Sequence, residues 1–379
     1  MNVIGIVTEY NPLHNGHIYQ IKKIKEMYPD SIIVVAMSAN YTMRGEISVL
    51  DKWTKTKLCL ENGIDIVLEI PFIYANQSSD IFSYAAIKML SAFKIDTLVF
   101  GSESNNLDKL KAISKVQINN NEFDTLVKKY LDKGYNYPTS LAKSIHDITG
   151  YTIKESNDIL AVSYIKEIIK NNYNINIVPI KRTNSFKSSL MSSLMSSDII
   201  SAYQIRQLLK SNINISKYIP YNKKYIRNID YAKLFLLIKY KVISEYNKIE
   251  EYHLITEGIE KRIYDGILKS DNYEELVNYV SNKRVTINKV NRMLINIFVG
   301  FTKEDKENTK NLSYIKLLGL SSEGKKYYSK IKKNISIPVY TKFEKNVMDT
   351  ELKASYLYSL IVNDKSIFKS EITSHVITK

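Results

Sequence analysis

Residues 3–25 read VIGIVTEYNPLHNGHIYQIKKIK, and this stretch sets the fold of the first half of the chain. Residues 3–8 are apolar and rich in β-branched side chains, which is typical of a strand buried on both faces. From Ile18 onward isoleucines recur every three residues with lysines between them, which predicts an amphipathic helix. A buried strand followed directly by such a helix indicates an α/β domain with a parallel sheet.

The same alternation continues along the first half of the chain. Further apolar runs of strand length are separated by segments of helix length, and they lie at residues 31–37, 64–70, 97–100 and 175–180. This repetition predicts a Rossmann-like parallel sheet with helices on both faces and right-handed crossovers. Ligands of such sheets bind beyond the carboxyl ends of the strands, so we expect a site in the segments that follow them.

The second half of the chain has a different pattern. Beyond residue 231 strand patterns largely vanish, and helical patterns occupy residues 231–246, 273–280, 289–298 and 352–361. A chain of 379 residues is longer than one ordinary domain. We therefore predict an α/β domain over residues 1–215 and a mostly helical, basic domain over residues 216–379.

The composition indicates an ordered protein of a reducing compartment. Hydrophobic residues make up 44% of the chain, and Cys59 is the sole cysteine, which excludes internal disulfides and thiolate zinc sites. The most apolar helical stretch, residues 234–238, is far shorter than the roughly 20 residues of a membrane span. The chain also starts without a basic leader, so we expect a cytoplasmic protein with no membrane contact.

The charge balance favours a polyanionic partner. Lys and Arg number 54 against 39 Asp and Glu, a net charge of +15. A genome biased toward Lys, Asn, Ile and Tyr would explain the same excess. In the second half basic side chains cluster with tyrosines, which predicts contacts to RNA by Lys283, Arg284, Arg292, Lys325 and Lys326. A solvated helix face with tyrosines toward the core is the alternative for each cluster.

The segment after the first strand carries the strongest chemical signal. Pro12 prevents an early helix, and Gly16 permits close approach of a ligand. His17 falls in the first helical turn, where unpaired N–H groups favour anions, and His14 faces the same place from the preceding turn. We therefore predict that two imidazoles donate hydrogen bonds to the phosphates of a nucleotide. A His-x-Gly-His pattern is expected roughly 0.002 times in a shuffled chain of this composition.

This spacing resembles the HxGH signature of the nucleotidyltransferase superfamily. The chain as a whole is similar to the bacterial tRNA(Met) cytidine acetate ligase family, through residues 5–17, 37–41, 44–46, 51–53, 68–72, 100–103, 156–161, 201–206, 291–294 and 314–319. The resemblance implies a ligase that activates acetate with ATP to acetyl-adenylate. It further implies transfer of the acetyl group to N4 of the wobble cytidine of elongator tRNA(Met), with Mg²⁺ accompanying the nucleotide.

The resemblance also implies site residues. The catalytic ones are His14, His17 and Arg182. The ATP-binding ones are Val7, Thr8, Glu9, Tyr10, Asn11, Pro12, Leu13, His14, Asn15, Gly16, His17, Ile18, Tyr19, Gln20, Gly101, Asn157, Arg182, Thr183 and Arg206. No metal held by the protein is expected, because the remaining histidines are scattered without ligand spacing.

The residues themselves leave several alternatives open. Gly101 ends a strand and either admits adenine or ribose or is an ordinary strand-to-loop glycine. Asn157 either contacts ATP or caps its helix, and Arg182 either binds phosphate or forms a surface ion pair. Arg44, Asp51 and Lys52 could each contact acetate, magnesium or the tRNA base, and the sequence does not distinguish these three roles.

Two departures from the family pattern affect the phosphate side of the site. Residues 185–197 contain a nearly verbatim Ser-Ser-Leu-Met duplication, which predicts a mobile loop, either an active-site lid or a tolerated expansion. Tyr203 stands where a smaller residue is expected.

Two other functions compete with the ligase. One is a nucleotidyltransferase that adenylylates a small phosphorylated metabolite, for which a basic helical second half is unnecessary. The other is a tRNA-binding protein without activity, which the intact residues 14–17 argue against.

Overall fold

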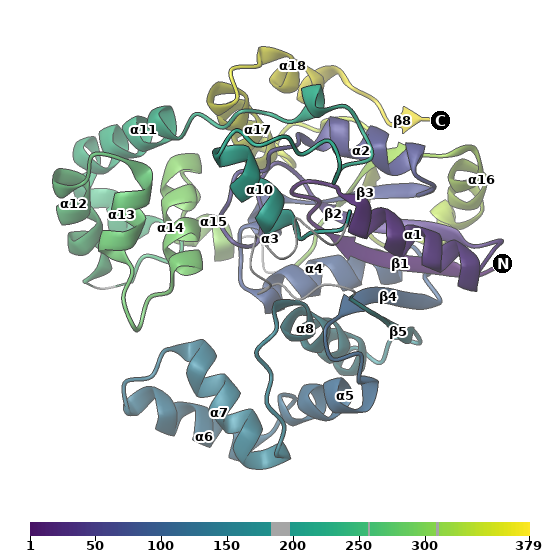
Figure 1. Ribbon diagram of the computed structural model, residues 1–379, viewed down its shortest axis with the longest axis horizontal. Helices are drawn as coiled ribbons and strands as arrows, with labels where there is room; N and C mark the ends of the chain where they lie inside the picture. Colours follow the sequence, from purple (N-terminus) through teal and green to yellow (C-terminus); the bar gives the residue numbers. More distant parts are fainter. Residues whose placement is uncertain (183–197, 257, 308–310) are drawn as a thin grey trace.

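A single mixed sheet organises both halves of the chain (Figure 1). The computed structural model describes residues 1–182, 198–256, 258–307 and 311–379. The strand order is β5-β4-β1-β2-β3-β6-β7, with β8 paired to β6. The predicted loop at residues 185–197 and the predicted ATP contact Thr183 lie outside the described residues.

Five strands from the first half form the parallel part of the sheet. They are β1 (Val3–Thr8), β2 (Ile32–Ser38), β3 (Ile66–Ile70), β4 (Thr97–Ser102) and β5 (Asn176–Lys181). Each pairs in parallel with its neighbours in the order β5-β4-β1-β2-β3. The bounds agree with the predicted runs to within two residues, and the predicted Rossmann-like α/β fold is confirmed.

Strand β2 shows how the sequence builds two cores. All seven of its residues are buried. Ile33 and Val35 pack in the core that contains the apolar side chains of α1 (Asn15–Met27) and α2 (Lys52–Glu61). Val34 and Ala36 join the core on the opposite face, which contains those of α4 (Ser79–Ala92) and α8 (Ser156–Lys170). Because side chains alternate along a strand, a continuous apolar run is needed where helices cover both faces.

The remaining helices of the first half surround this sandwich. They are α3 (Phe72–Ala75), α5 (Leu107–Val116), α6 (Asn121–Asp132), α7 (Tyr137–Thr149) and α10 (Ala202–Lys210). Figure 1 shows α6 and α7 as a pair that projects below the sheet. Among the described residues, no helix is both long and apolar enough to cross a bilayer.

The second half is mostly helical, and four of its helices match the predicted patterns. Its helices are η1 (Lys223–Tyr225), α11 (Tyr231–Ser244), η2 (Tyr246–Glu251), α12 (Ile259–Lys269), α13 (Tyr273–Val280), α14 (Ile287–Val299), α15 (Lys303–Glu307), α16 (Ser322–Ile331), η3 (Lys332–Asn334), α17 (Asp349–Ile361) and α18 (Lys365–Thr373). The four helices that match the predicted patterns are α11, α13, α14 and α17.

Three strands of the second half extend the sheet, which the sequence analysis did not predict. They are β6 (Ile315–Leu320), β7 (Val339–Tyr340) and β8 (Ile377–Thr378). β6 runs antiparallel to β3, and all its residues are buried. The division at residue 215 stays a prediction, and residues on both sides of it share one sheet.

A buried ionic cluster joins the two halves beside this junction. The Lys52 ammonium lies 2.8 Å from a Glu69 oxygen and 2.6 Å from a Glu371 oxygen, and all three side chains are at most 2% exposed. Lys52 belongs to α2, Glu69 to β3 and Glu371 to α18. A buried cation between two carboxylates is costly to remove, because the carboxylates would remain unpaired away from water.

We expect Lys52→Met to destabilise the protein by about 3–5 kcal/mol, because it leaves two buried carboxylates without their cation. Urea unfolding followed by circular dichroism would measure the change. Lys57→Met on the same helix is the matched control, because that side chain is 55% exposed, and it should change stability by less than about 0.5 kcal/mol. Equal effects of the two substitutions would contradict this account of the cluster.

Candidate active site

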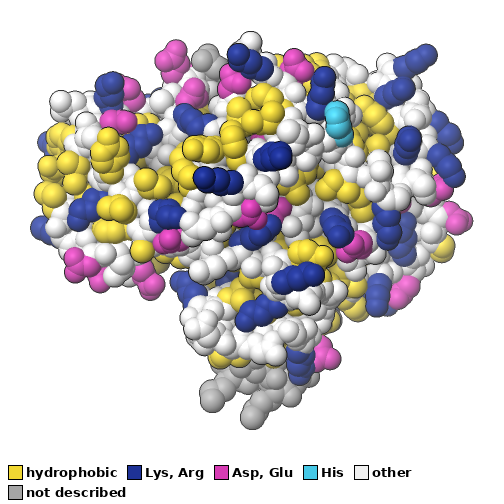
Figure 2. All heavy atoms as spheres, turned by 90° about the horizontal axis from the view of Figure 1, so that it is seen from above, with side chains coloured by type: hydrophobic (Ala, Val, Ile, Leu, Met, Phe, Trp, Pro, Cys, Tyr) yellow, Lys and Arg dark blue, Asp and Glu magenta, His cyan; other side chains and the backbone are white. Residues whose placement is uncertain are grey.

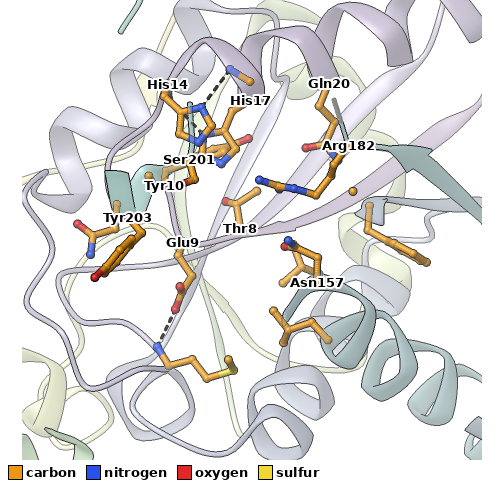
Figure 3. A pocket seen from close by; sticks show the side chains of 18 of the residues that line it. Thr8, Glu9, Tyr10, His14, His17, Gln20, Asn157, Arg182, Ser201 and Tyr203 are labelled. Atoms are coloured by element: carbon orange, nitrogen blue, oxygen red, sulfur yellow. Dashed lines mark hydrogen bonds between the residues drawn. The ribbon is translucent and has the colours of Figure 1, made fainter. Parts of the chain in front are cut away.

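A cavity of about 220 Å³ opens at the carboxyl edge of the sheet (Figure 3). The ends of β1, β4 and β5 line it together with the first turns of α1, α8 and α10. A segment that follows β2 closes a further side through Met43, Arg44 and Glu46. The cavity therefore lies where the strand pattern predicts a ligand site.

His14 and His17 hold each other in place at the start of α1. His14 is the N-cap residue, and its Nδ1 accepts a hydrogen bond from the Gly16 N–H at 3.0 Å. In return, Nδ1 of His17 accepts one from the His14 N–H at 3.2 Å. The ring centroids lie 3.8 Å apart. A Cβ on Gly16 would lie 2.8 Å from His14 Cε1, so the glycine makes room for the cap as well as for a ligand.

Both imidazoles are neutral in this arrangement. Burial, with smaller contributions from the charges of Arg182 and Arg206, lowers the pKa of His14 to about 3. Burial also lowers the pKa of His17, with additional effects of His14 and Arg182. Because each Nδ1 is an acceptor, the single ring proton is on Nε2. The first turn of α1 carries no acidic residue, so these two Nε2–H donors stand at an uncompensated positive helix end.

Titration of the ligand-free protein tests this protonation state. We expect ¹⁵N spectra of the His14 ring to show the neutral Nε2–H tautomer down to about pH 4, because its pKa lies near 3. Since this value lies below the ordinary 6.5, the neutral ring contributes stability above pH 6.5, and this is lost as the pH falls toward 3. His146, which is exposed on α7, is the ring with which the spectra of the buried His14 are compared. A protonated His14 at pH 6 would contradict the assignment.

The side of the cavity at β4 and β5 carries three predicted residues. Gly101 is the second-last residue of β4, Asn157 lies in the first turn of α8, and Arg182 follows β5. The N-cap residue of α8 is Glu155, so the alternative that Asn157 caps the helix is wrong. A Cβ on Gly101 would meet Arg182 Cγ at 3.4 Å, an ordinary contact, so packing does not demand a glycine there.

Glu103 fixes this side, although the sequence analysis did not select it. Its Oε1 accepts a hydrogen bond from Asn157 Nδ2 at 2.6 Å, and its Oε2 accepts one from the Asp158 N–H at 3.2 Å. Arg182 Nε lies 3.8 Å from Glu103 Oε1. One carboxylate thus positions the amide and the guanidinium that line the cavity. The signal available in the sequence was its place directly after β4, at the edge where ligands bind.

We expect Glu103→Ala to weaken ATP binding about tenfold, because Asn157 and Arg182 lose the carboxylate that orients them. Isothermal titration calorimetry with a non-hydrolysable ATP analogue would measure the affinity. Glu122→Ala on the exposed surface of α6 serves as the control and should leave it unchanged. An unaltered affinity in the Glu103 variant would rule out this positioning role.

Arg206 occupies the cavity but is already paired. Its guanidinium donates to the Asn11 carbonyl oxygen at 2.6 Å and lies 2.8 Å from a Glu46 oxygen. These bonds tie α10 to the loop after β1 and to the segment after β2. Arg206 therefore holds the cavity wall together, while the predicted phosphate contact stays a prediction.

The structure sorts the remaining predicted residues of the segment after β1. Those that line the cavity are Val7, Thr8, Glu9, Tyr10, Asn11, His14, Gly16, His17, Tyr19 and Gln20, whereas Pro12, Leu13, Asn15 and Ile18 do not. Asn15 instead bonds the carbonyl oxygens of Asp198 and Lys217. Lining residues that the sequence analysis missed include Glu46, Phe82, Tyr164 and Ser201, and Tyr203, which it noted as a departure from the family pattern, also lines the cavity.

The three residues with open roles after β2 are now distinguished. Arg44 lines the cavity. Asp51 caps α2 and pairs with Arg227 at 2.9 Å. Lys52 belongs to the buried ionic cluster. Only Arg44 of the three is therefore placed to meet a ligand.

The predicted RNA contacts lie in different surroundings. Arg292 of α14 donates to the Met43 carbonyl oxygen at 3.1 Å and so reaches the cavity segment, whereas Lys283 and Arg284 are exposed in the loop before α14. Lys325 and Lys326 lie on α16. The first turn of this helix packs against Asp65, the residue before β3, and hence lies at the sheet edge opposite the cavity. These contacts stay predictions.

Two further observations concern the basic surface. On α16 Tyr327 is buried and its hydroxyl donates to the Phe93 carbonyl oxygen, whereas Lys325 and Lys326 are exposed. This arrangement agrees with the alternative of a solvated lysine face and does not test contact with RNA. Figure 2 shows Lys and Arg spread over one face of the molecule among apolar and acidic side chains, and on this face they do not gather into one continuous basic patch.

Comparison with known proteins identifies the family. A family model described as HIGH Nucleotidyl Transferase matches residues 1–372. The tRNA(Met) cytidine acetate ligase of Clostridium novyi is 35% identical over the whole of both chains, and that of Clostridium acetobutylicum is 32% identical over 95% of this chain and 96% of its own.

Solved structures show the same likeness. Thermotoga maritima TmcAL in its apo form superposes with a TM-score of 0.90 at 26% identity, covering 100% of this chain and 99% of that one. TmcAL bound with alpha-thio ATP gives a TM-score of 0.87 with the same identity and coverage. The chain therefore belongs to the HIGH nucleotidyl transferase family and, within it, to the tRNA(Met) cytidine acetate ligases.

Proposed function

We propose that this protein is an ATP-dependent ligase that converts acetate to acetyl-adenylate and transfers the acetyl group to N4 of the wobble cytidine of elongator tRNA(Met). The observation that carries this proposal is the pair of neutral imidazoles at the start of α1, whose Nε2–H groups stand at one cavity with Arg182. The names of its relatives specify acetate, cytidine and tRNA(Met). We place the reaction in the cytoplasm, where tRNA is available.

The cavity supports the first step through hydrogen bonding and charge. An acetate oxygen attacks the α-phosphorus of ATP, and pyrophosphate leaves from the opposite side. His14 and His17 donate to phosphate oxygens as negative charge builds up, and Arg182 neutralises that charge. Neutral imidazoles suit this role because Nε2–H donors are already oriented by their Nδ1 contacts. The chain needs no nucleophile of its own, since both bonds form between substrates.

Magnesium enters this proposal only as a companion of ATP. Among the described residues, no group of three or more His, Cys, Asp or Glu side chains could hold a metal ion. Glu103, the carboxylate near Asn157, is committed to hydrogen bonds with the protein. These residues do not fit a resident cation, and Mg²⁺ in ATP is bound chiefly by phosphate oxygens and water.

One assay separates this function from its competitors. The protein is incubated with ATP, labelled acetate and total tRNA, and label in tRNA and pyrophosphate exchange are both recorded. Label in tRNA that depends on ATP supports the ligase. Exchange that requires a phosphorylated metabolite in place of acetate would indicate a small-molecule nucleotidyltransferase. Binding of tRNA without any turnover would indicate an inactive binding protein.

We expect His17→Ala to slow acetate-dependent ATP–pyrophosphate exchange by about 10²–10³, because one donor to the developing charge is lost. Affinity for tRNA, measured by filter binding, should barely change, since the imidazole acts on the phosphates. An equal loss in tRNA affinity would contradict the assigned role.

A further inference from the structure

The cavity carries different polar groups on two of its sides. Its imidazoles and Arg182 stand on the side of α1 and β5, whereas Glu9 and Glu46 line another side together with Arg44. Figure 3 shows the Glu9 side chain leaving the end of β1 away from Asn157 and Arg182. Glu46 is already paired with Arg206 at 2.8 Å, so Glu9 is the carboxylate of this side that Arg206 does not pair. A carboxylate at a cavity wall is suited to a substrate group that donates hydrogen bonds.

The Glu9 carboxylate is anchored and faces the cavity. Its Oε1 accepts a hydrogen bond from the Met43 N–H at 2.7 Å. The side chain is partly exposed and lines the cavity, so a ligand can reach the carboxylate. The backbone beneath it is fixed as well, because the buried Lys55 ammonium donates to the Glu9 carbonyl oxygen at 2.7 Å. The Glu9 carboxylate is thus held in a fixed position on the cavity wall.

Aromatic side chains stand near this carboxylate. Phe82, Phe100 and Tyr164 line the same cavity, and the rings of Phe100 and Tyr164 lie 6.2 Å apart. The Glu9 charge contributes to the raised pKa of Tyr164, which indicates that the two groups lie close together. Aromatic rings bind the faces of unstacked bases, and a carboxylate accepts a hydrogen bond from the N4 amine of cytosine. Phe82, Phe100 and Tyr164 are almost wholly buried, so they form an apolar wall beside the carboxylate, and the carboxylate itself matches the N4 amine of a cytosine base.

We propose that Glu9 is the general base of the acetyl-transfer step, an inference that rests on the proposed function. The cytidine N4 attacks the acetyl carbonyl carbon, and a C–N bond forms. The bond between that carbon and the phosphate oxygen breaks, and AMP leaves with the electron pair. One N4 proton passes to the Glu9 carboxylate, which later releases it to water. The sequence analysis had placed Glu9 among the ATP contacts.

The surroundings of Glu9 support proton transfer. Burial raises its pKa above the ordinary 4.5, and the Glu46 charge adds to the rise. The Arg44 and Lys55 charges and the Met43 N–H act in the opposite direction without cancelling it. A carboxylate with a raised pKa is a stronger proton acceptor, and general bases contribute about 10²–10⁴ in rate. Because the protonated form is inactive as a base, the transfer rate should fall as the pH drops through this raised value.

Glu9→Gln tests the proposal with little structural disturbance. The amide oxygen of glutamine can still accept the Met43 N–H, whereas the proton acceptor is lost. Two rates are measured on the intact enzyme: acetate-dependent ATP–pyrophosphate exchange, and acetyl transfer to tRNA in a single turnover after acetyl-adenylate has formed. Glu61→Gln, an exposed carboxylate at the end of α2, is the matched control. Thermal unfolding verifies that all variants are folded.

We expect Glu9→Gln to slow transfer by about 10² more than it slows exchange, with the acidic limb of the transfer pH profile removed. Glu9→Asp should restore that limb in part. Unchanged transfer, or an equal loss of exchange and transfer, would overturn the role of Glu9 and leave the proposed function standing. Wild-type protein without acetate-dependent exchange would instead overturn the proposed function, and this inference with it.

Discussion

The reciprocal hydrogen bonds between residues 14 and 17 are the constraint on which the rest of the site depends. His14 accepts from the backbone of α1 and His17 accepts from the backbone of His14, so both rings are fixed before any ligand arrives. The same bonds force the ring protons onto Nε2, and burial keeps the rings neutral. A pair of oriented donors at a helix N-terminus costs little reorganisation when phosphate charge develops.

The two sides of the cavity suit two successive steps. Glu103 orients Asn157 and Arg182 beside the imidazoles, where a nucleotide belongs. The segment after β2 brings Met43 and Glu46 to the other side and is held there by Arg206 and Arg292. Since Arg292 belongs to α14, the helical half of the chain directly supports the wall that carries Glu9. The two halves therefore build one site.

Much of this architecture could be predicted from the sequence because its signals are local. Strands β1 to β5 are largely apolar runs that alternate with helical patterns, and residues 14–17 form a compact motif at the first crossover. β6 could not be predicted so readily, because it lies among helical patterns and its partner β3 is distant in the chain. Glu103 and Glu46 also escaped prediction, because their roles arise from hydrogen bonds and ion pairs that no local pattern encodes.

The most direct test is a crystal structure of this protein with a non-hydrolysable ATP analogue. The account predicts that Nε2 of His14 and of His17 both lie within hydrogen-bonding distance of phosphate oxygens, with Arg182 on the same phosphates. Phosphates bound away from both rings, or rings turned so that Nδ1 faces the nucleotide, would contradict it.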